Sequence, residues 1–199
     1  DVVLMVRRPG PEEFRLMKPG TTLIAMTDPY DHAGAIAEIA AAGITTFTME
    51  FMPRITRAQV MDVLSSQANL AGYQAVVEAT YAFHRAFPMM MTAAGTVPAA
   101  KVFIMGAGVA GLQAIATARR MGAVVTATDV RPAAKEQVES LGAKFVAVED
   151  EEFKQAETAA GYAKPMSAEY QAKQAALVAE DRKSTRLNSS HTDILVCRL

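Results

Sequence analysis

The sequence has few residues of the kinds that bind metals or form disulfides: its 199 residues include one cysteine, three histidines and no tryptophan. Cys197 has no second cysteine to pair with, and no cluster of cysteine and histidine has the spacing of metal ligands. These absences predict a protein of a reducing compartment, without a disulfide and without a structural metal.

Charge of one sign and long apolar runs are also missing. The chain carries 20 basic and 21 acidic residues, and the basic ones are scattered, which argues against nucleic acid as a partner. The most apolar stretch, 102–118, is interrupted by three glycines and is shorter than the ~20 apolar residues of a membrane span. We therefore expect a buried strand, turn and helix there.

Short runs rich in β-branched residues alternate with helical patterns, which is typical of parallel α/β folds. Strands are predicted at 2–6, 22–26, 44–49, 101–105, 124–129 and 144–148. Helices are predicted at 31–42, 57–87, 109–121, 133–141 and 167–180. The segment 149–164 is expected to be a long loop that moves, and Met89–Met91 are expected to be buried packing residues.

The segment Gly106-Ala107-Gly108-Val109-Ala110-Gly111 has the spacing GxGxxG between a predicted strand and a predicted helix. In dinucleotide-binding folds the first glycine permits a tight turn, the second lets the backbone approach a pyrophosphate, and the third lets helix and strand pack closely. The helix N-terminus directs free N–H groups at the phosphates. This context favours a Rossmann-type site for NAD(H) over a glycine-rich turn without a ligand.

Asp129 ends the next predicted strand about 20 residues further on, where dinucleotide-binding enzymes have a carboxylate that accepts hydrogen bonds from the adenosine ribose. A carboxylate there repels a 2′-phosphate, which favours NAD over NADP. Two alternatives stay open. Asp129 followed by Pro132 also has the pattern of a helix start, and Arg131 could receive a phosphate.

These elements predict an α/β fold with the first half of a Rossmann-type parallel sheet and the remnant of a second α/β domain, truncated at both ends. The predicted parts are a partial N-terminal domain at 1–56, a linking helix at 57–90 and a partial NAD-binding domain at 91–181. The polar stretch 182–199 lacks periodicity and is set aside as a non-native tail. Strand 101–105 is then expected to have one exposed edge, and the chain alone to be inactive.

A polar stripe follows Arg54 in the predicted linking helix, since Gln59, Asp62 and Ser65 recur every three residues on one helical face. Such a face can hold the carboxamide and ribose of a nicotinamide, but it is also what a solvated helix surface presents. Thr56 and Gln59 have the spacing of a capping box, which gives Gln59 a purely structural alternative.

Residues 44–180 resemble the NAD(H)-binding domain I, in the alpha subunit, of proton-translocating NAD(P) transhydrogenase, of the alanine dehydrogenase/transhydrogenase superfamily. The similarity lies in separate blocks that follow one another in the same order. They are PRITRAQ at 53–59, LSSQANLAGY at 64–73, GAGVAGL at 106–112, DVRP at 129–132 and GYAK at 161–164. Residues 1–43 fit the preceding domain less distinctively.

The resemblance implies hydride transfer from NADH to NADP⁺ held by a partner domain, in a complex whose membrane part moves protons. It implies that Arg54, Asp62 and Ser65 orient the NADH carboxamide, that Gln59 reaches toward the second nucleotide, and that Tyr162 closes over the site. The nucleotide-binding residues that it implies are Gly106, Gly108, Val109, Ala110, Gly111, Asp129, Val130, Arg131 and Tyr162.

The resemblance also implies partners and a location. The partners are the NADP-binding and membrane domains or subunits of the transhydrogenase, and a second copy of the chain when the protein is intact. The location is the cytoplasmic side of the inner membrane, as a peripheral domain of the complex.

Alanine dehydrogenase shares this ancestry and is the main alternative function. It needs a cationic residue and a histidine near the strand ends of the first domain, to bind a keto acid and move a proton. Met5 stands where a lysine is expected, and 22–30 contain no histidine. A non-catalytic NAD-binding module is a third alternative, but such a module has no need of a polar face beyond the adenosine half.

Overall fold

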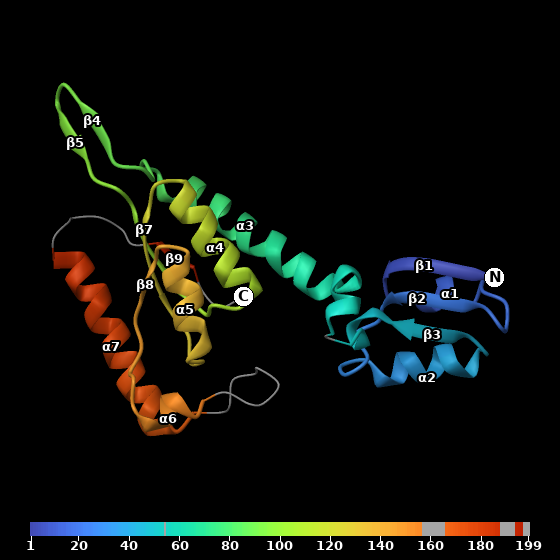
Figure 1. Cartoon of the computed structure of the whole chain (residues 1–199). Coiled ribbons are helices and arrows are strands. Elements are labelled where there is room, and N and C mark those ends of the chain that lie inside the picture. The colour runs from blue at the N-terminus through green and yellow to red at the C-terminus, as the bar shows by residue number, and fades with distance from the viewer. Residues whose placement is uncertain (54, 157–165, 188–193, 197–199) are drawn as a thin grey trace. The chain divides into compact units, whose positions relative to one another are not determined.

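The computed structural model describes residues 1–199 except residue 54 and residues 157–165, 188–193 and 197–199. The chain divides into two compact units, 1–66 and 67–199, which are described separately (Figure 1). None of the helices in the described part of the chain is long and apolar enough to cross a bilayer.

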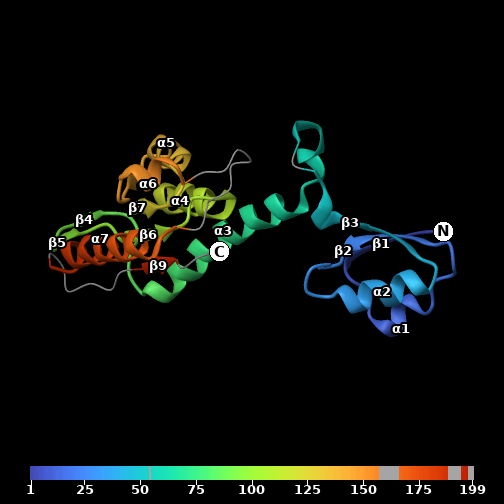
Figure 2. The ribbon, with the colours of Figure 1, turned by 90° about the horizontal axis from the view of Figure 1, so that it is seen from below.

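Unit 1 is a three-stranded parallel sheet with two helices on one side of it. The strands lie in the order β1 (Val2–Arg7), β2 (Thr22–Met26), β3 (Thr45–Thr48), and α1 (Pro11–Phe14) and α2 (Ala33–Ala41) connect them. Figure 2 shows both helices below the strands. Leu23 and Ala25 of β2 face them and are fully buried against Phe14 and Ile39. The predicted strands and helix of this part are confirmed.

The predicted helix 57–87 is confirmed over 63–83, but it begins later and ends earlier than expected. A 3₁₀ helix, η2 (Thr56–Met61), ends at Asp62, whose ψ of 90° lies outside the helical range. Helix α3 (Val63–Phe83) starts directly after Asp62 and ends before His84, which has a φ of 55°. A shorter 3₁₀ helix, η1 (Met49–Phe51), follows β3.

Unit 2 contains a four-stranded parallel sheet in the order β8-β7-β6-β9. The strands are β6 (Lys101–Met105), β7 (Val124–Thr128), β8 (Lys144–Phe145) and β9 (Ile194–Val196). The helices are α4 (Val109–Arg120), α5 (Ala133–Ser140), α6 (Glu151–Lys154) and α7 (Ala168–Leu187), besides α3. Ile104 and Val125 of the sheet pack against Ile115 of α4 and Val138 of α5 in one buried core. The βαβ pattern predicted for 101–148 is confirmed.

Two features of unit 2 differ from expectation. β9 pairs in parallel along β6, with Phe103 opposite Leu195, so the predicted exposed edge of β6 is covered. β4 (Met90–Thr92) and β5 (Gly95–Val97) form an antiparallel hairpin, which Figure 1 shows projecting from the sheet. Met91 is 80% exposed, so the prediction of buried methionines is wrong.

Close packing of α3 on α4 generates the first prediction, for Gly72→Ala. A Cβ on Gly72 would overlap the carbonyl oxygen of Ala110 and lie 2.8 Å from its carbonyl carbon. Because both groups are helix backbone, we expect the substitution to destabilise unit 2 by ~1–3 kcal/mol. The measurement is urea denaturation followed by circular dichroism, since the chain has no tryptophan.

Gly34→Ala is the matched control, because Gly34 lies inside α2 and nothing is within 4 Å of its Cβ position. Alanine favours helix over glycine, so this variant should keep or slightly raise the free energy of unfolding. Equal unfolding midpoints for the two variants would contradict the close contact of α3 and α4.

Candidate functional site

The glycine turn lies where the strand order in unit 2 changes direction. β7 and β8 extend the sheet on one side of β6, and β9 lies on the other side. In open α/β sheets, ligands bind at the carboxyl ends of the strands at such a point. The chain leaves β6 there, passes through Gly106 to Gly108 and enters α4.

Two of the three glycines are required by the fold itself. Gly106 has a φ of 96°, a backbone conformation that side chains disfavour, and its N–H donates to the Thr128 carbonyl at 2.8 Å. A Cβ on Gly111 would overlap the carbonyl oxygen of Gly106 and lie 2.8 Å from its carbonyl carbon. These two glycines therefore permit the turn and the close packing of α4 on β6.

Gly108 is different, because none of the described residues requires a glycine there. Its φ of -75° is open to any residue, and no atom lies within 4 Å of its Cβ position. Gly108 is exposed, and a Cβ would project into open space at the start of α4. Space at this point lets a ligand approach the backbone, which is what the second glycine of a dinucleotide-binding turn provides.

The N-terminus of α4 is available to an anion. Gly108 is its N-cap and supplies no side-chain cap. The N–H groups of the first turn, from Val109 to Gly111, have no acceptor within the helix, and the helix dipole places partial positive charge there. The open space at Gly108 and these donors together fit a pyrophosphate.

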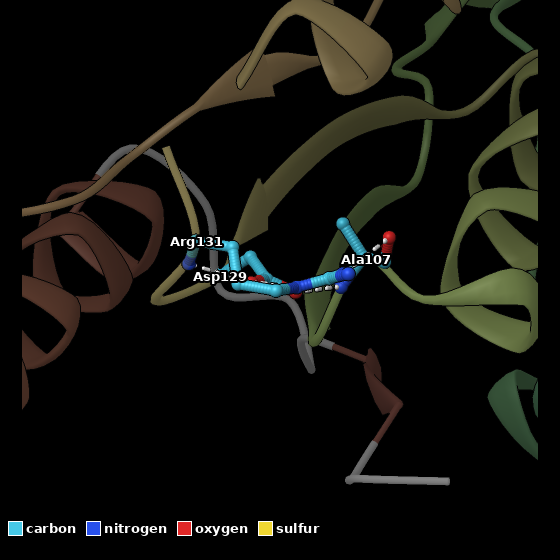
Figure 3. Close-up of polar contacts among 3 residues, drawn as sticks. All are labelled: Ala107, Asp129 and Arg131. Atoms are coloured by element: carbon cyan, nitrogen blue, oxygen red, sulfur yellow. Dashed lines mark hydrogen bonds and ion pairs between the residues drawn. The ribbon is translucent and has the colours of Figure 1, made fainter. Parts of the chain in front are cut away.

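Asp129 follows β7 and ties its end to the glycine turn. Its Oδ2 accepts from the Ala107 N–H at 2.7 Å, and its Oδ1 accepts from the Arg131 N–H at 2.8 Å. The guanidinium of Arg131 donates to both carboxylate oxygens and to the Ala107 carbonyl, at 3.1 to 3.2 Å. Figure 3 shows these three residues joined by dashed lines.

The Asp129 carboxylate is held in its ionised form. Its side chain is 8% exposed, and this burial by itself raises the pKa. The hydrogen bond from the Arg131 side chain, those from the Ala107 and Arg131 backbone, and the charge of Arg131 outweigh burial. Together they hold the pKa of Asp129 below its ordinary value. The carboxylate is therefore charged, and both of its oxygens are bonded to Ala107 or Arg131.

The segment before α3 is not the continuous helical face that the sequence predicts. Gln59 lies exposed in η2, and Asp62 lies in the break between η2 and α3. The predicted capping box of Thr56 and Gln59 is wrong, because the N-cap of η2 is Ile55 and no side chain caps it. The structure therefore separates Gln59 from the start of α3.

Asp62 and Ser65 are brought together. The Asp62 carboxylate accepts from the Ser65 N–H at 3.0 Å and from the Ser65 hydroxyl at 2.7 Å. Asp62 thus caps α3, in the manner that capping acids satisfy the first free N–H groups of a helix. Arg54 and Tyr162, which the sequence also singles out, lie outside the described residues.

The sequence did not predict a role for Gln174 of α7, which forms hydrogen bonds at the end of β7. Its amide donates to the Thr128 hydroxyl at 2.7 Å and accepts from the Val148 N–H at 2.8 Å. A lone glutamine on a helix carries no signal for such contacts. Among the described residues, no group of three or more His, Cys, Asp or Glu side chains is arranged to hold a metal ion.

Comparison with known families gives two matches. The model of the alanine dehydrogenase/PNT N-terminal domain matches residues 1–71, and that of the alanine dehydrogenase/PNT C-terminal domain matches residues 75–197. An NAD(P) transhydrogenase subunit alpha protein of Rhodospirillum rubrum is 56% identical over 190 residues, which cover 93% of this chain and 50% of that protein. The chain therefore spans about half the length of the curated relatives it matches.

The chain is also similar to solved structures of a transhydrogenase and of L-alanine dehydrogenase. The crystal structure of transhydrogenase from Sinorhizobium meliloti matches with a TM-score of 0.79 and 66% identity, over 90% of this chain and 47% of that one. L-alanine dehydrogenase matches with a TM-score of 0.60 and 21% identity, over 72% of this chain and 41% of that one, and so shares the fold. Sequence identity is much higher to the transhydrogenases than to L-alanine dehydrogenase. With both of its domain models matched, the chain belongs to the alanine dehydrogenase/PNT family.

Proposed function

We propose that this chain is the NAD(H)-binding part of a proton-translocating transhydrogenase, in which hydride passes from NADH to NADP⁺ bound on a partner domain. The observation that carries the proposal is the open space at Gly108, in front of an uncapped helix N-terminus and next to the Asp129 turn. The similarity to transhydrogenases of two organisms supports it.

In this proposal, the glycine turn holds the pyrophosphate and Asp129 accepts hydrogen bonds from the adenosine ribose. The N–H groups of Val109, Ala110 and Gly111 point to the phosphates, while Val130 and Arg131 flank the ribose. The Asp129 carboxylate is ionised and its side chain is only 8% exposed, so its negative charge repels a 2′-phosphate at this position. This arrangement supports NAD(H) rather than NADP(H).

The proposed nicotinamide contacts come from the segment around Asp62. The hydrogen-bonded pair of Asp62 and Ser65 orients the carboxamide together with Arg54, and exposed Gln59 contacts the second nucleotide. Tyr162 is proposed to cover the bound nucleotide. NAD(H) supplies the hydride chemistry when bound, so the protein groups have to bind and align rather than transfer protons.

The proposal extends to partners and location. The name of the Rhodospirillum rubrum relative includes the words subunit alpha, which supports the proposal that the protein has further subunits. We propose that NADP-binding and membrane subunits are among them. A second copy of the chain is a proposed partner as well, and the exposed methionines of the β4–β5 hairpin support such a contact. The proposed location is the cytoplasmic side of the inner membrane.

Amino-acid oxidation is less well supported. Met5, at the position where alanine dehydrogenase is expected to have a lysine, is partly buried and packs against the core of unit 1. A thioether there cannot bind a keto acid by charge. The similarity to L-alanine dehydrogenase extends to the fold alone.

Gly108→Ala tests the pyrophosphate site. The methyl group would occupy the open space at the start of α4, where no atom of the described residues lies within 4 Å, so stability should not change. NADH binding should weaken at least ~10-fold, since phosphate oxygens could no longer approach the backbone. Calorimetric titration measures the affinity, and Gly34→Ala in unit 1 is the control. Undiminished affinity would remove the glycine turn from the site.

Asp129→Ala tests the ribose acceptor. We expect NADH affinity to fall by on the order of 1 to 3 kcal/mol, the cost of leaving ribose hydroxyls without a charged acceptor. Glu136→Ala removes an exposed carboxylate from α5 and should leave binding unchanged. The proposal for Asp129 fails if both variants bind NADH as the unchanged protein does.

Gln59→Ala tests contact with the second nucleotide. Since Gln59 caps no helix, its loss should slow hydride transfer to NADP⁺ on an added partner domain, with NADH affinity and stability nearly unchanged. Asp62→Ala is the contrasting variant, and it should cost ~0.5–2 kcal/mol of stability because α3 loses its cap. A normal transfer rate for Gln59→Ala would exclude the proposed contact.

A further inference from the structure

The Asp129 carboxylate has no acceptor position left for a ribose. An ionised carboxylate offers about four lone-pair positions. Two of them are taken by the backbone N–H groups of Ala107 and Arg131, at 2.7 and 2.8 Å. The other two are taken by Nε and Nη2 of the Arg131 guanidinium, at 3.1 and 3.2 Å. Hydroxyl donors can therefore bind only where one of these groups withdraws.

The two kinds of donor differ in their freedom to withdraw. The backbone donors belong to turns that are fixed at the sheet, because the N–H of Gly106 is bonded to the Thr128 carbonyl. The Arg131 guanidinium is the end of a long side chain with several rotatable bonds, and it is 25% exposed. It also donates to the Ala107 carbonyl at 3.2 Å, a contact that it gives up when it withdraws. It approaches the two carboxylate oxygens as a two-pronged donor, one nitrogen to each oxygen. The adjacent 2′ and 3′ hydroxyls of a ribose form a similar pair of donors.

We infer that the Arg131 guanidinium is an internal competitor for the adenosine ribose: it occupies the two positions on Asp129 that the ribose hydroxyls take, and it withdraws when the nucleotide binds. This inference rests on the proposed function. It assigns Arg131 a role opposite to that of a ligand. Arg131 lowers affinity for the nucleotide instead of contributing to it.

Arg131 stabilises the Asp129 carboxylate in the nucleotide-free protein. A carboxylate whose side chain is only 8% exposed is costly to leave without a charged partner. Arg131 provides that partner, keeps Asp129 ionised and holds its oxygens in place. When the nucleotide leaves, the guanidinium binds Asp129 again. Dissociation of the nucleotide therefore does not leave the carboxylate without a charged partner. Arg131 thereby favours release of the nucleotide, and release limits the turnover of many enzymes.

Arg131→Met separates a competitor from a ligand. Removing a partly exposed ion pair should tighten NADH binding on the order of fivefold in calorimetric titration. Arg120→Met removes the same charge from the other end of α4 and should not tighten binding. When Asp129→Asn is also present, Arg131→Met should no longer raise the affinity for NADH. Unchanged or weaker NADH binding by Arg131→Met would overturn the inference.

A second measurement uses the unchanged protein and does not depend on how a variant folds. The Nε–H resonance of Arg131 in NMR, assigned with Arg131→Lys, should move toward the position of free arginine when AMP is added. Nicotinamide mononucleotide, which lacks the adenosine ribose, should leave it in place. A resonance unmoved by saturating AMP would also overturn the inference. The proposed function fails separately, if Asp129→Ala binds NADH normally.

Discussion

The Asp129 carboxylate joins two turns that the sheet of unit 2 brings side by side. The ladder between β6 and β7 ends with Met105 opposite Thr128, and two hydrogen bonds continue it into the turns. One runs from the Gly106 N–H to the Thr128 carbonyl, and the other from the Ala107 N–H to Asp129. Without the carboxylate, the Ala107 N–H would lose its partner, and the bond from Gly106 to Thr128 would remain to hold the glycine turn at the end of β7. The proposed pyrophosphate site and the proposed ribose acceptor are therefore parts of one hydrogen-bonded unit.

The parts of the fold that depend on periodic burial could be predicted from the sequence. β2, β6 and β7 match their predicted ranges to within a residue, because strands with at least one buried face need apolar or β-branched residues there. The glycine turn could be predicted too, since a strand, GxGxxG and a helix occur together in few other contexts. Parallel pairing then follows from the connecting helices, and it brings Asp129 beside Ala107, 22 residues away in sequence.

Features that depend on a single local contact could not be predicted in this way. The apolar pattern continues through Asp62, yet its carboxylate binds Ser65 more favourably as a cap than it would inside a helix, and the chain breaks there. The methionines of the β4–β5 hairpin have the composition of a core but lie on a projecting hairpin. β9 has only three residues and lies in the polar stretch 182–199, whose composition does not predict a strand. The two-pronged contact of Arg131 with Asp129 is likewise a matter of side-chain geometry.

The three motif glycines show how far a motif can carry a functional conclusion. Gly106 is required by its positive φ and Gly111 by the packing of α4 on β6, so any strand, turn and helix of this geometry would need them, with or without a nucleotide. Gly108 is required by neither constraint, since its φ is ordinary and the space around it is open. The open space at this glycine supports the proposal that a ligand approaches the backbone there. Of the three motif glycines, Gly108 is therefore the one that supports the proposed binding site, and the other two establish only that the turn can form.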